Sequence, residues 1–252
     1  MVIPEPELLP LALGVCLLAG LVHGAFGLGF PLVATPLLAL MTDVKTAILL
    51  TLAPNIAVNL WSLVRGGGWR ERVARYWPVA LWMLAGSAVG TLLLAAMDPN
   101  PFRLLLAATV VVYLVSDRLQ RVDWVWIRKH PAGSGAWAGF IGGVLGGTVN
   151  VGGPALMIYF LELRVPPLVL VQAINLCFLL GKTTQAVTFT ALGFVGAPLL
   201  QTVPPLLIAS LVGLRSGMWI RDRVDAPTYR VWLRGLLWLL CGLLVVQFLR
   251  EL

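Results

Sequence analysis

The chain has 252 residues, of which 59% are hydrophobic and 12% are charged, and its mean hydropathy is +0.91. Soluble domains are nearer half apolar and a quarter charged. This composition therefore excludes a water-soluble globular protein and predicts an all-α polytopic membrane protein. The formal net charge of +7 comes mostly from arginines between apolar runs, which indicates membrane topology rather than nucleic-acid binding.

Apolar runs follow one another along nearly the whole chain, and together they predict eight to ten membrane segments. Two runs, 31–41 and 153–161, are too short to cross a hydrocarbon core that needs about 20 residues. Both follow a glycine-rich break and begin beside a proline, so we expect broken or short helices there, which either cross or re-enter. The other runs are 8–26, 46–64, 77–96, 102–116, the Gly-rich 136–149, 169–192, 198–214 and 231–249.

Loop charges predict the orientation in the membrane. Most basic residues fall in the loops 65–76, 117–135 and 215–230, which the positive-inside rule places in the cytoplasm. The loops 97–101 and 193–197 contain no Lys or Arg and are predicted outside. Both termini are then also outside. The predicted location is the plasma (inner) membrane, crossed many times.

The sequence resembles itself at an offset of 123 residues. Gly24–Pro31 (GAFGLGFP) lies over Gly147–Pro154 (GTVNVGGP), and similar features follow in the same order in both halves. We therefore expect a first transmembrane repeat at 1–116, a cytoplasmic linker at 117–135 and a second repeat at 136–252. Each half has about five helical segments, an odd number, so the repeats should be inverted. Inverted repeats with broken helices are typical of transporters that bind their substrate near the midplane.

The two breaks are candidate binding sites. A half-helix that starts at Pro31 or Pro154 exposes unpaired N–H groups, which attract anions together with the helix dipole. Close packing of helices by small residues is a second possible reason for the glycines. The candidate substrate-binding residues at the breaks are Gly27, Gly29, Phe30, Pro31, Thr148, Asn150, Gly152, Gly153 and Pro154.

Two spans carry polar residues at matching depths. Lys182 is the fourteenth residue of the run 169–192, and it lies over Asn59 at the 123-residue offset. A charge at that depth needs partners and indicates a functional site, although a lysine in a short span can also extend to the interface. Asn55, Asn59, Asn175, Lys182 and Gln185 complete the predicted substrate site.

Several kinds of chemistry have no support in the sequence. All eleven Asp and Glu lie in loops or at termini, so no intramembrane carboxylate is present to bind sodium or relay protons. Cys16, Cys177 and Cys241 are isolated, and we expect no cofactor, no metal and no catalytic residues. His23, beside the first break, is a candidate for proton coupling; it could equally be a hydrogen-bonded interhelical histidine.

The glycine-rich stretch Gly24–Pro36 and its counterpart Gly142–Pro154 resemble the two repeats of the sulfite exporter TauE/SafE family of membrane permeases. The resemblance extends from about residue 8 to 249 and includes the basic middle loop. It implies export of sulfite or small organosulfonates, such as sulfoacetate, from the cytoplasm. The first break reads Gly-Phe-Pro31 where the second reads Gly-Gly-Pro154, so we expect the halves to contribute unequally.

The leading hypothesis is therefore a transporter of small anions, not an enzyme. A membrane enzyme or redox conduit would need a nucleophile with a base, paired Cys or paired His, and His130, the second histidine, lies in a loop. The composition is also compatible with an anion channel or a purely structural scaffold, but a scaffold leaves Lys182 unexplained. The expected partners are a small anion and membrane lipid, without nucleic acid, and a homodimer is one candidate for the oligomeric state.

Overall fold

The computed structural model describes residues 8–115, 124–221 and 226–250, and this part of the chain is helical, without strands. The termini and parts of two basic loops, including Arg118, Arg121 and Arg223, lie outside the described residues. The elements are α1 (Leu9–Phe26), α2 (Phe30–Met41), α3 (Val44–Arg65), α4 (Trp69–Val73), η2 (Ala74–Tyr76), α5 (Trp77–Ala96), α6 (Asn100–Leu114), α8 (Val125–Lys129), α9 (Pro131–Thr148), α10 (Gly153–Glu162), α11 (Pro167–Ala191), α12 (Ala197–Arg221) and α13 (Ala226–Arg250).

The prediction of a polytopic helical membrane protein is confirmed. Five helices in the described ranges are long and apolar enough to cross a membrane: Leu9–Phe26, Val44–Arg65, Arg70–Ala96, Pro167–Ala191 and Ala197–Arg221. Large apolar side chains cover their outer faces; Val187 and Ile208, for example, are 65% and 63% exposed. A bilayer solvates such a surface, whereas water does not.

The predicted loops were too long where helices adjoin the arginine-rich loops. α9 begins at Pro131 rather than at 136, and α12 continues to Arg221 beyond the predicted end at 214. Helices do not stop where the apolar run stops, because arginine is a good helix former and proline fits the first helical turn. The two short segments are helices of 12 and 10 residues, α2 and α10, as expected.

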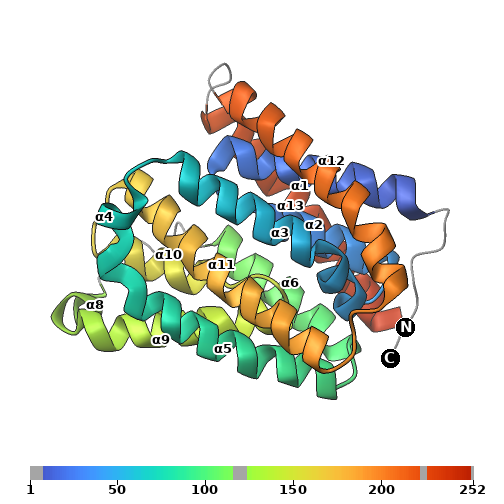
Figure 1. The fold of residues 1–252 in the computed structure, drawn as a ribbon, viewed down its shortest axis with the longest axis horizontal. Coiled ribbons are helices and arrows are strands. Elements are labelled where there is room, and N and C mark those ends of the chain that lie inside the picture. Colours follow the sequence, from blue (N-terminus) through green and yellow to red (C-terminus); the bar gives the residue numbers. More distant parts are fainter. Residues whose placement is uncertain (1–7, 116–123, 222–225, 251–252) are drawn as a thin grey trace.

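Two pairs of helices form the outer sides of the molecule. In Figure 1, α1 lies beside α12 along the upper side and α5 beside α9 along the lower side, with α3 and α11 between the pairs. In the upper pair, a Cβ added to Gly20 or Gly24 would overlap the backbone of α12 at Ser210 or Leu214. The later glycine of α1 faces the later residue of α12, so the two helices run parallel, with glycines at their contact.

The lower pair is built in the same way. A Cβ on Gly86 would overlap the Phe140 carbonyl oxygen, and one on Gly90 would overlap that of Val144, so α5 and α9 are also parallel. Between the pairs, α3 runs antiparallel to α11, because the Gln172 Nε2 near the start of α11 donates to the Gly67 carbonyl oxygen, just beyond the end of α3, at 3.0 Å.

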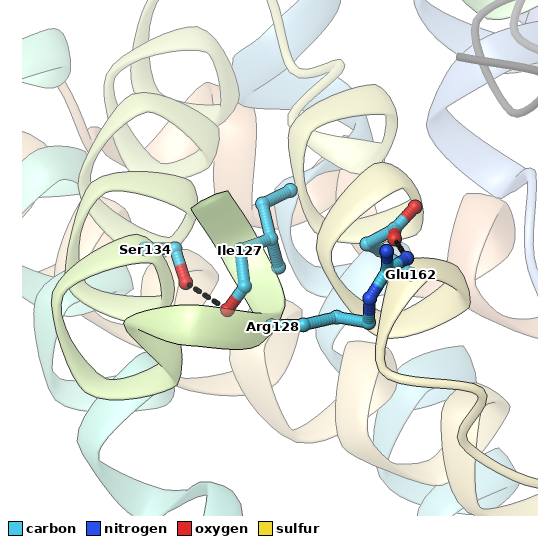
Figure 2. Close-up of polar contacts among 4 residues, drawn as sticks. All are labelled: Ile127, Arg128, Ser134 and Glu162. Carbon is cyan, nitrogen blue, oxygen red and sulfur yellow. Dashed lines mark hydrogen bonds and ion pairs between the residues drawn. The ribbon is translucent and has the colours of Figure 1, made fainter. Parts of the chain in front are cut away.

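These contacts bring the arginine-rich segments to one end of the molecule, which we call the basic end (65–76, 124–130 and 215–221). Arg65 at the end of α3 contacts the Met218 sulfur near the end of α12. At the other side of the same end, Arg128 of α8 pairs with Glu162, the last residue of α10, as Figure 2 shows. Ser134 of α9 donates to the Ile127 carbonyl oxygen at 3.3 Å, which holds α8 against α9.

Candidate functional site at the two helix breaks

The first break joins α1 to α2 through two glycines with positive φ. Gly27 has φ 77° and Gly29 has φ 110°, a region that favours glycine. Asn175 of α11 donates from Nδ2 to the Gly27 carbonyl oxygen at 2.9 Å. His23, in the last turn of α1, shares a 3.0 Å hydrogen bond between its Nε2 and the Ser62 Oγ of α3. The break is thus fixed against both α3 and α11.

At the start of α2, Phe30 is fully buried and Pro31 occupies the first turn. No side chain caps this helix start within the described residues. The N–H groups of the first turn have no carbonyl partner within a helix, and Pro31 has no N–H to satisfy. The break therefore presents a helix N-terminus to the interior of the protein.

The second break joins α9 to α10 through Asn150, whose φ is 66°. Its Nδ2 donates to the Thr35 Oγ1 of α2 at 2.7 Å and to the Thr51 Oγ1 of α3 at 3.2 Å. Its Oδ1 accepts from the Asn55 Nδ2 at 3.3 Å. Asn150 tolerates the left-handed conformation better than most residues, and its side chain connects this break to the other half of the chain.

Lys182 and Gln185 bind the end of α9, immediately before the second break. The Lys182 ammonium donates to the Gly146 carbonyl oxygen at 2.7 Å and to the Gln185 Oε1 at 2.5 Å. Gln185 donates from Nε2 to the Gly147 carbonyl oxygen at 2.8 Å. The last carbonyls of a helix lack intrahelical partners and carry its negative dipole end, so this pair of side chains caps α9. Lys182 is 2% exposed and does not extend to the surface.

The two ends before the breaks have matching contacts. Adding the offset of 123 to His23, Ser62 and Asn59 gives 146, 185 and 182, which are Gly146, Gln185 and Lys182. The last turn of α1 therefore contacts α3 where the last turn of α9 contacts α11. The groups that make these contacts differ between the halves. The first half uses the side chains of a histidine and a serine, and at the matching positions the second half has a backbone carbonyl and a side-chain amide.

The structure brings the predicted residues together in two groups. One group, Asn175 and His23, lies at the first break. The other group lies at the second break, which Asn55 contacts through Asn150 and which follows the end of α9 that Lys182 and Gln185 bind. Asn59 donates within its own helix to Asn55, and Thr148 donates to the Val144 carbonyl oxygen. Gly152, Gly153 and Pro154 form the start of α10.

Three contact residues were missing from the predicted site: Thr35, Thr51 and Ser62. Each is a hydroxyl residue inside an apolar run. Thr51 is one turn before Asn55, so a search for polar residues at helical spacing would have found it.

A cavity of about 440 Å³ lies elsewhere, at the basic end. Arg75, Tyr76, Pro131 and Tyr159 are among its lining residues, and none of the predicted site residues lines it. The hydrogen-bond network, rather than this cavity, therefore defines the candidate site.

Residues 12–244 match the protein family described as "Sulfite exporter TauE/SafE", nearly the whole chain. The chain belongs to this family. No curated protein and no solved structure matches it. Membership in the TauE/SafE family makes the chain a membrane transporter of sulfur-containing anions, in agreement with its apolar helices.

Proposed function

We propose that this TauE/SafE protein exports sulfite or a small organosulfonate, such as sulfoacetate, by alternating access. The substrate is held near the midplane, between the two halves of the chain, at the helix breaks. The main support for the proposal is the pair of broken helices. Both breaks contact the antiparallel helices α3 and α11 through buried polar side chains, and Lys182 supplies a buried cation. Buried polar groups at such breaks bind ions and substrates in transporters.

The proposal includes an inverted repeat, which the packing of the helices supports. The offset of 123 residues relates α1 to α9, α3 to α11, and approximately α5 to α12. Under that exchange, the parallel pair of α1 and α12 becomes the parallel pair of α9 and α5. The central helices α3 and α11 exchange with each other and are antiparallel, as two oppositely oriented repeats require.

Flux into proteoliposomes tests the proposal. Purified protein is reconstituted, and transport of sulfite, sulfoacetate, sulfate and acetate is measured with and without protein. We expect protein-dependent movement of sulfite or sulfoacetate that saturates with concentration. Transport of neither would contradict the proposed function, and linear, unsaturable flux would favour a channel.

A further inference from the structure

The cavity at the basic end, of about 440 Å³, has one cationic side chain in its lining, that of Arg75. Arg75 is exposed and lies against the ring of Tyr76, with 4.8 Å between the Arg75 Cζ and the ring centroid. An arginine stacked on an aromatic ring keeps the N–H edge of its guanidinium available for phosphate oxygens. No carboxylate pairs with Arg75 in the part of the chain that the structure describes. Its charge is therefore available to a ligand in the cavity.

The rest of the lining combines a helix start with apolar side chains. Pro131 and Ala132 are the first two residues of α9, and within the described ranges no side chain caps this helix. The N–H groups of its first turn and the positive end of its dipole add to the charge of Arg75. Apolar surface comes from Pro78, Val79, Ala136 and Leu163. A matching ligand therefore has an anionic group attached to an apolar body.

The cavity is closed toward the interior of the protein. Just beyond it, α5 and α9 are in backbone contact, because a Cβ on Gly139 would lie 2.3 Å from the Val79 carbonyl oxygen. On the side of α10, Phe160 packs edge-on against both Tyr76 and Tyr159, with ring centroids 5.1 Å apart in each pair. These contacts leave no room for passage toward the helix breaks, so the cavity is not an entrance to the candidate substrate site.

Its surroundings place the cavity at the depth of lipid headgroups. Trp77 and Trp137 adjoin lining residues in the sequence, and they are 40% and 60% exposed. Exposed tryptophans concentrate where headgroups meet the hydrocarbon core. One turn further along the same two helices, Trp82 packs edge-on against Phe140, with ring centroids 6.4 Å apart. The cavity thus adjoins the apolar outer faces of α5 and α9, which form the lower side of the molecule in Figure 1.

We propose that this cavity binds the headgroup of an anionic phospholipid from the leaflet that contacts the basic end. Arg75 and the start of α9 hold the phosphate, the apolar lining covers the glycerol backbone, and the acyl chains follow α5 and α9. Basic pockets between membrane helices recognise acidic headgroups in this way. Glu162, next to the lining residue Leu163, is paired with Arg128 (Figure 2), which offsets its repulsion of a phosphate. A free anion would make the polar contacts but leave the apolar lining unfilled.

Native mass spectrometry of the detergent-purified protein tests this proposal with two lipids of the same acyl chains, phosphatidylglycerol and phosphatidylcholine. Both contain a phosphate, and only the first has a net negative charge. We expect the wild type to prefer phosphatidylglycerol by at least about fivefold, the contribution of one basic residue at an anionic lipid surface. Equal binding would overturn the proposal. Displacement of phosphatidylglycerol by excess inorganic phosphate would also overturn it, because the site would then be one for free anions.

Two substitutions locate the preference in the cavity. Arg75→Gln removes the cation, and Ala136→Phe fills the cavity without changing the charge, so each should bring the preference close to unity. Arg215→Gln is the matched control, since Arg215 is an exposed arginine of α12 at the same end and does not line the cavity. The control should keep the preference of the wild type.

The ratio of two lipids is measured on each protein, so a variant with less folded protein still reports it. A preference that persists in both cavity variants would contradict the assignment. Equal loss in Arg215→Gln would contradict it as well, because the general charge of the basic end would then attract the lipid. Bound lipid rather than sulfite flux is measured, so failure of this proposal leaves the proposed function standing.

Discussion

The ammonium group of Lys182 is held inside the protein by backbone and amide oxygens. Placing a charged lysine at the centre of a membrane helix costs about 2.5–3.5 kcal/mol on insertion scales. Hydrogen bonds to charged groups contribute about 1.5–3 kcal/mol each, and Lys182 makes two, to Gly146 and Gln185. These bonds and the negative end of the α9 dipole offset the cost. Lys182 therefore has a structural role as a helix cap besides its proposed electrostatic one.

Substitution of Lys182 separates these two roles. Asn175 and Lys182 are seven residues apart on α11, about 10.5 Å along the axis. At that separation a unit charge attracts an anion by about 1.6 kcal/mol at an effective dielectric constant of about 20. Lys182→Gln keeps a donor for the Gly146 carbonyl but removes the charge, so we expect the Kd for the transported anion to rise on the order of tenfold. Calorimetric titration measures this change.

Lys45→Gln is the control, because Lys45 donates to the Ala95 carbonyl oxygen at the opposite end of the molecule from the basic end. The control should bind with nearly the affinity of the wild type. Unchanged affinity in Lys182→Gln, with its thermal unfolding lowered, would leave Lys182 with the capping role alone.

Glycines hold the helix pairs together at the scale of elements. In α1, a Cβ on Gly24 would overlap the Leu214 carbonyl oxygen of α12, whereas nothing lies within 4 Å of a Cβ on Gly14. Lipid tails provide no hydrophobic drive for helix association, so close backbone contact supplies much of the stability of such pairs. Close packing therefore explains the glycine stripes in α1, α5, α9 and α12, while Gly27 and Gly29 serve the break.

Alanine substitutions on α1 test this division. Gly24→Ala should lower the free energy of unfolding by about 1–3 kcal/mol, the usual cost of overpacking. Gly14→Ala should be neutral or stabilise the helix by up to about 1 kcal/mol, because alanine is the better helix former. Thermal unfolding of the two variants in the same detergent provides the comparison. Equal effects would show that the close contact of α1 with α12 contributes little.

The elements were largely predictable from the sequence, and the pairing of their side chains was not. Apolar runs and the glycine breaks before Pro31 and Pro154 located α2 and α10, because a bilayer imposes length and composition on each segment. The contacts of Asn150 with Thr35 and Thr51 depend on how distant segments pack. Hydrophobic periodicity and composition say nothing about which distant side chains meet. His23 was therefore predicted as a candidate, but its partner Ser62 was not.

The arrangement of the whole molecule agrees with the directions that loop charges assign to each helix. The positive-inside rule gives α1 and α12 the same direction across the membrane, and also α5 and α9, and each of these pairs packs in parallel. The basic end gathers Arg65, Arg128 and Arg221 from three separate parts of the chain. We therefore propose that the basic end faces the cytoplasm.

Labelling of single cysteines in intact cells tests this orientation. A cysteine at Asp98→Cys, between α5 and α6, should react with a membrane-impermeant reagent added outside, and one at Glu71→Cys, within α4, should react only after the cells are opened. The native cysteines are buried, so each should contribute a low background. Labelling of position 71 from outside, with position 98 protected, would reverse the assignment.

The energetics of export follow from the charge of the substrate and from the absence of carboxylates in the apolar runs. A cell interior is negative, so an anion that leaves it gains about 2.3 kcal/mol per charge at 100 mV. For a monoanion this corresponds to roughly fortyfold in concentration ratio, since 1.4 kcal/mol is tenfold. Efflux of a monoanion therefore needs no coupling ion, and a sodium site would have only backbone carbonyl, hydroxyl and amide oxygens near the midplane.

We accordingly predict that efflux responds to membrane potential and does not require sodium. Proteoliposomes loaded with sulfite, with the potential clamped by potassium and valinomycin, measure the response directly. An inside-negative potential should accelerate efflux, and replacing sodium with choline should leave it unchanged.

Proton entry through His23 is the competing mechanism, and His23→Gln compared with His130→Gln tests it, because His130 lies between α8 and α9 at the basic end. Flux that ignores the clamped potential and collapses without a sodium or proton gradient would contradict an electrogenic mechanism, since an uncompensated anion cannot cross without doing electrical work.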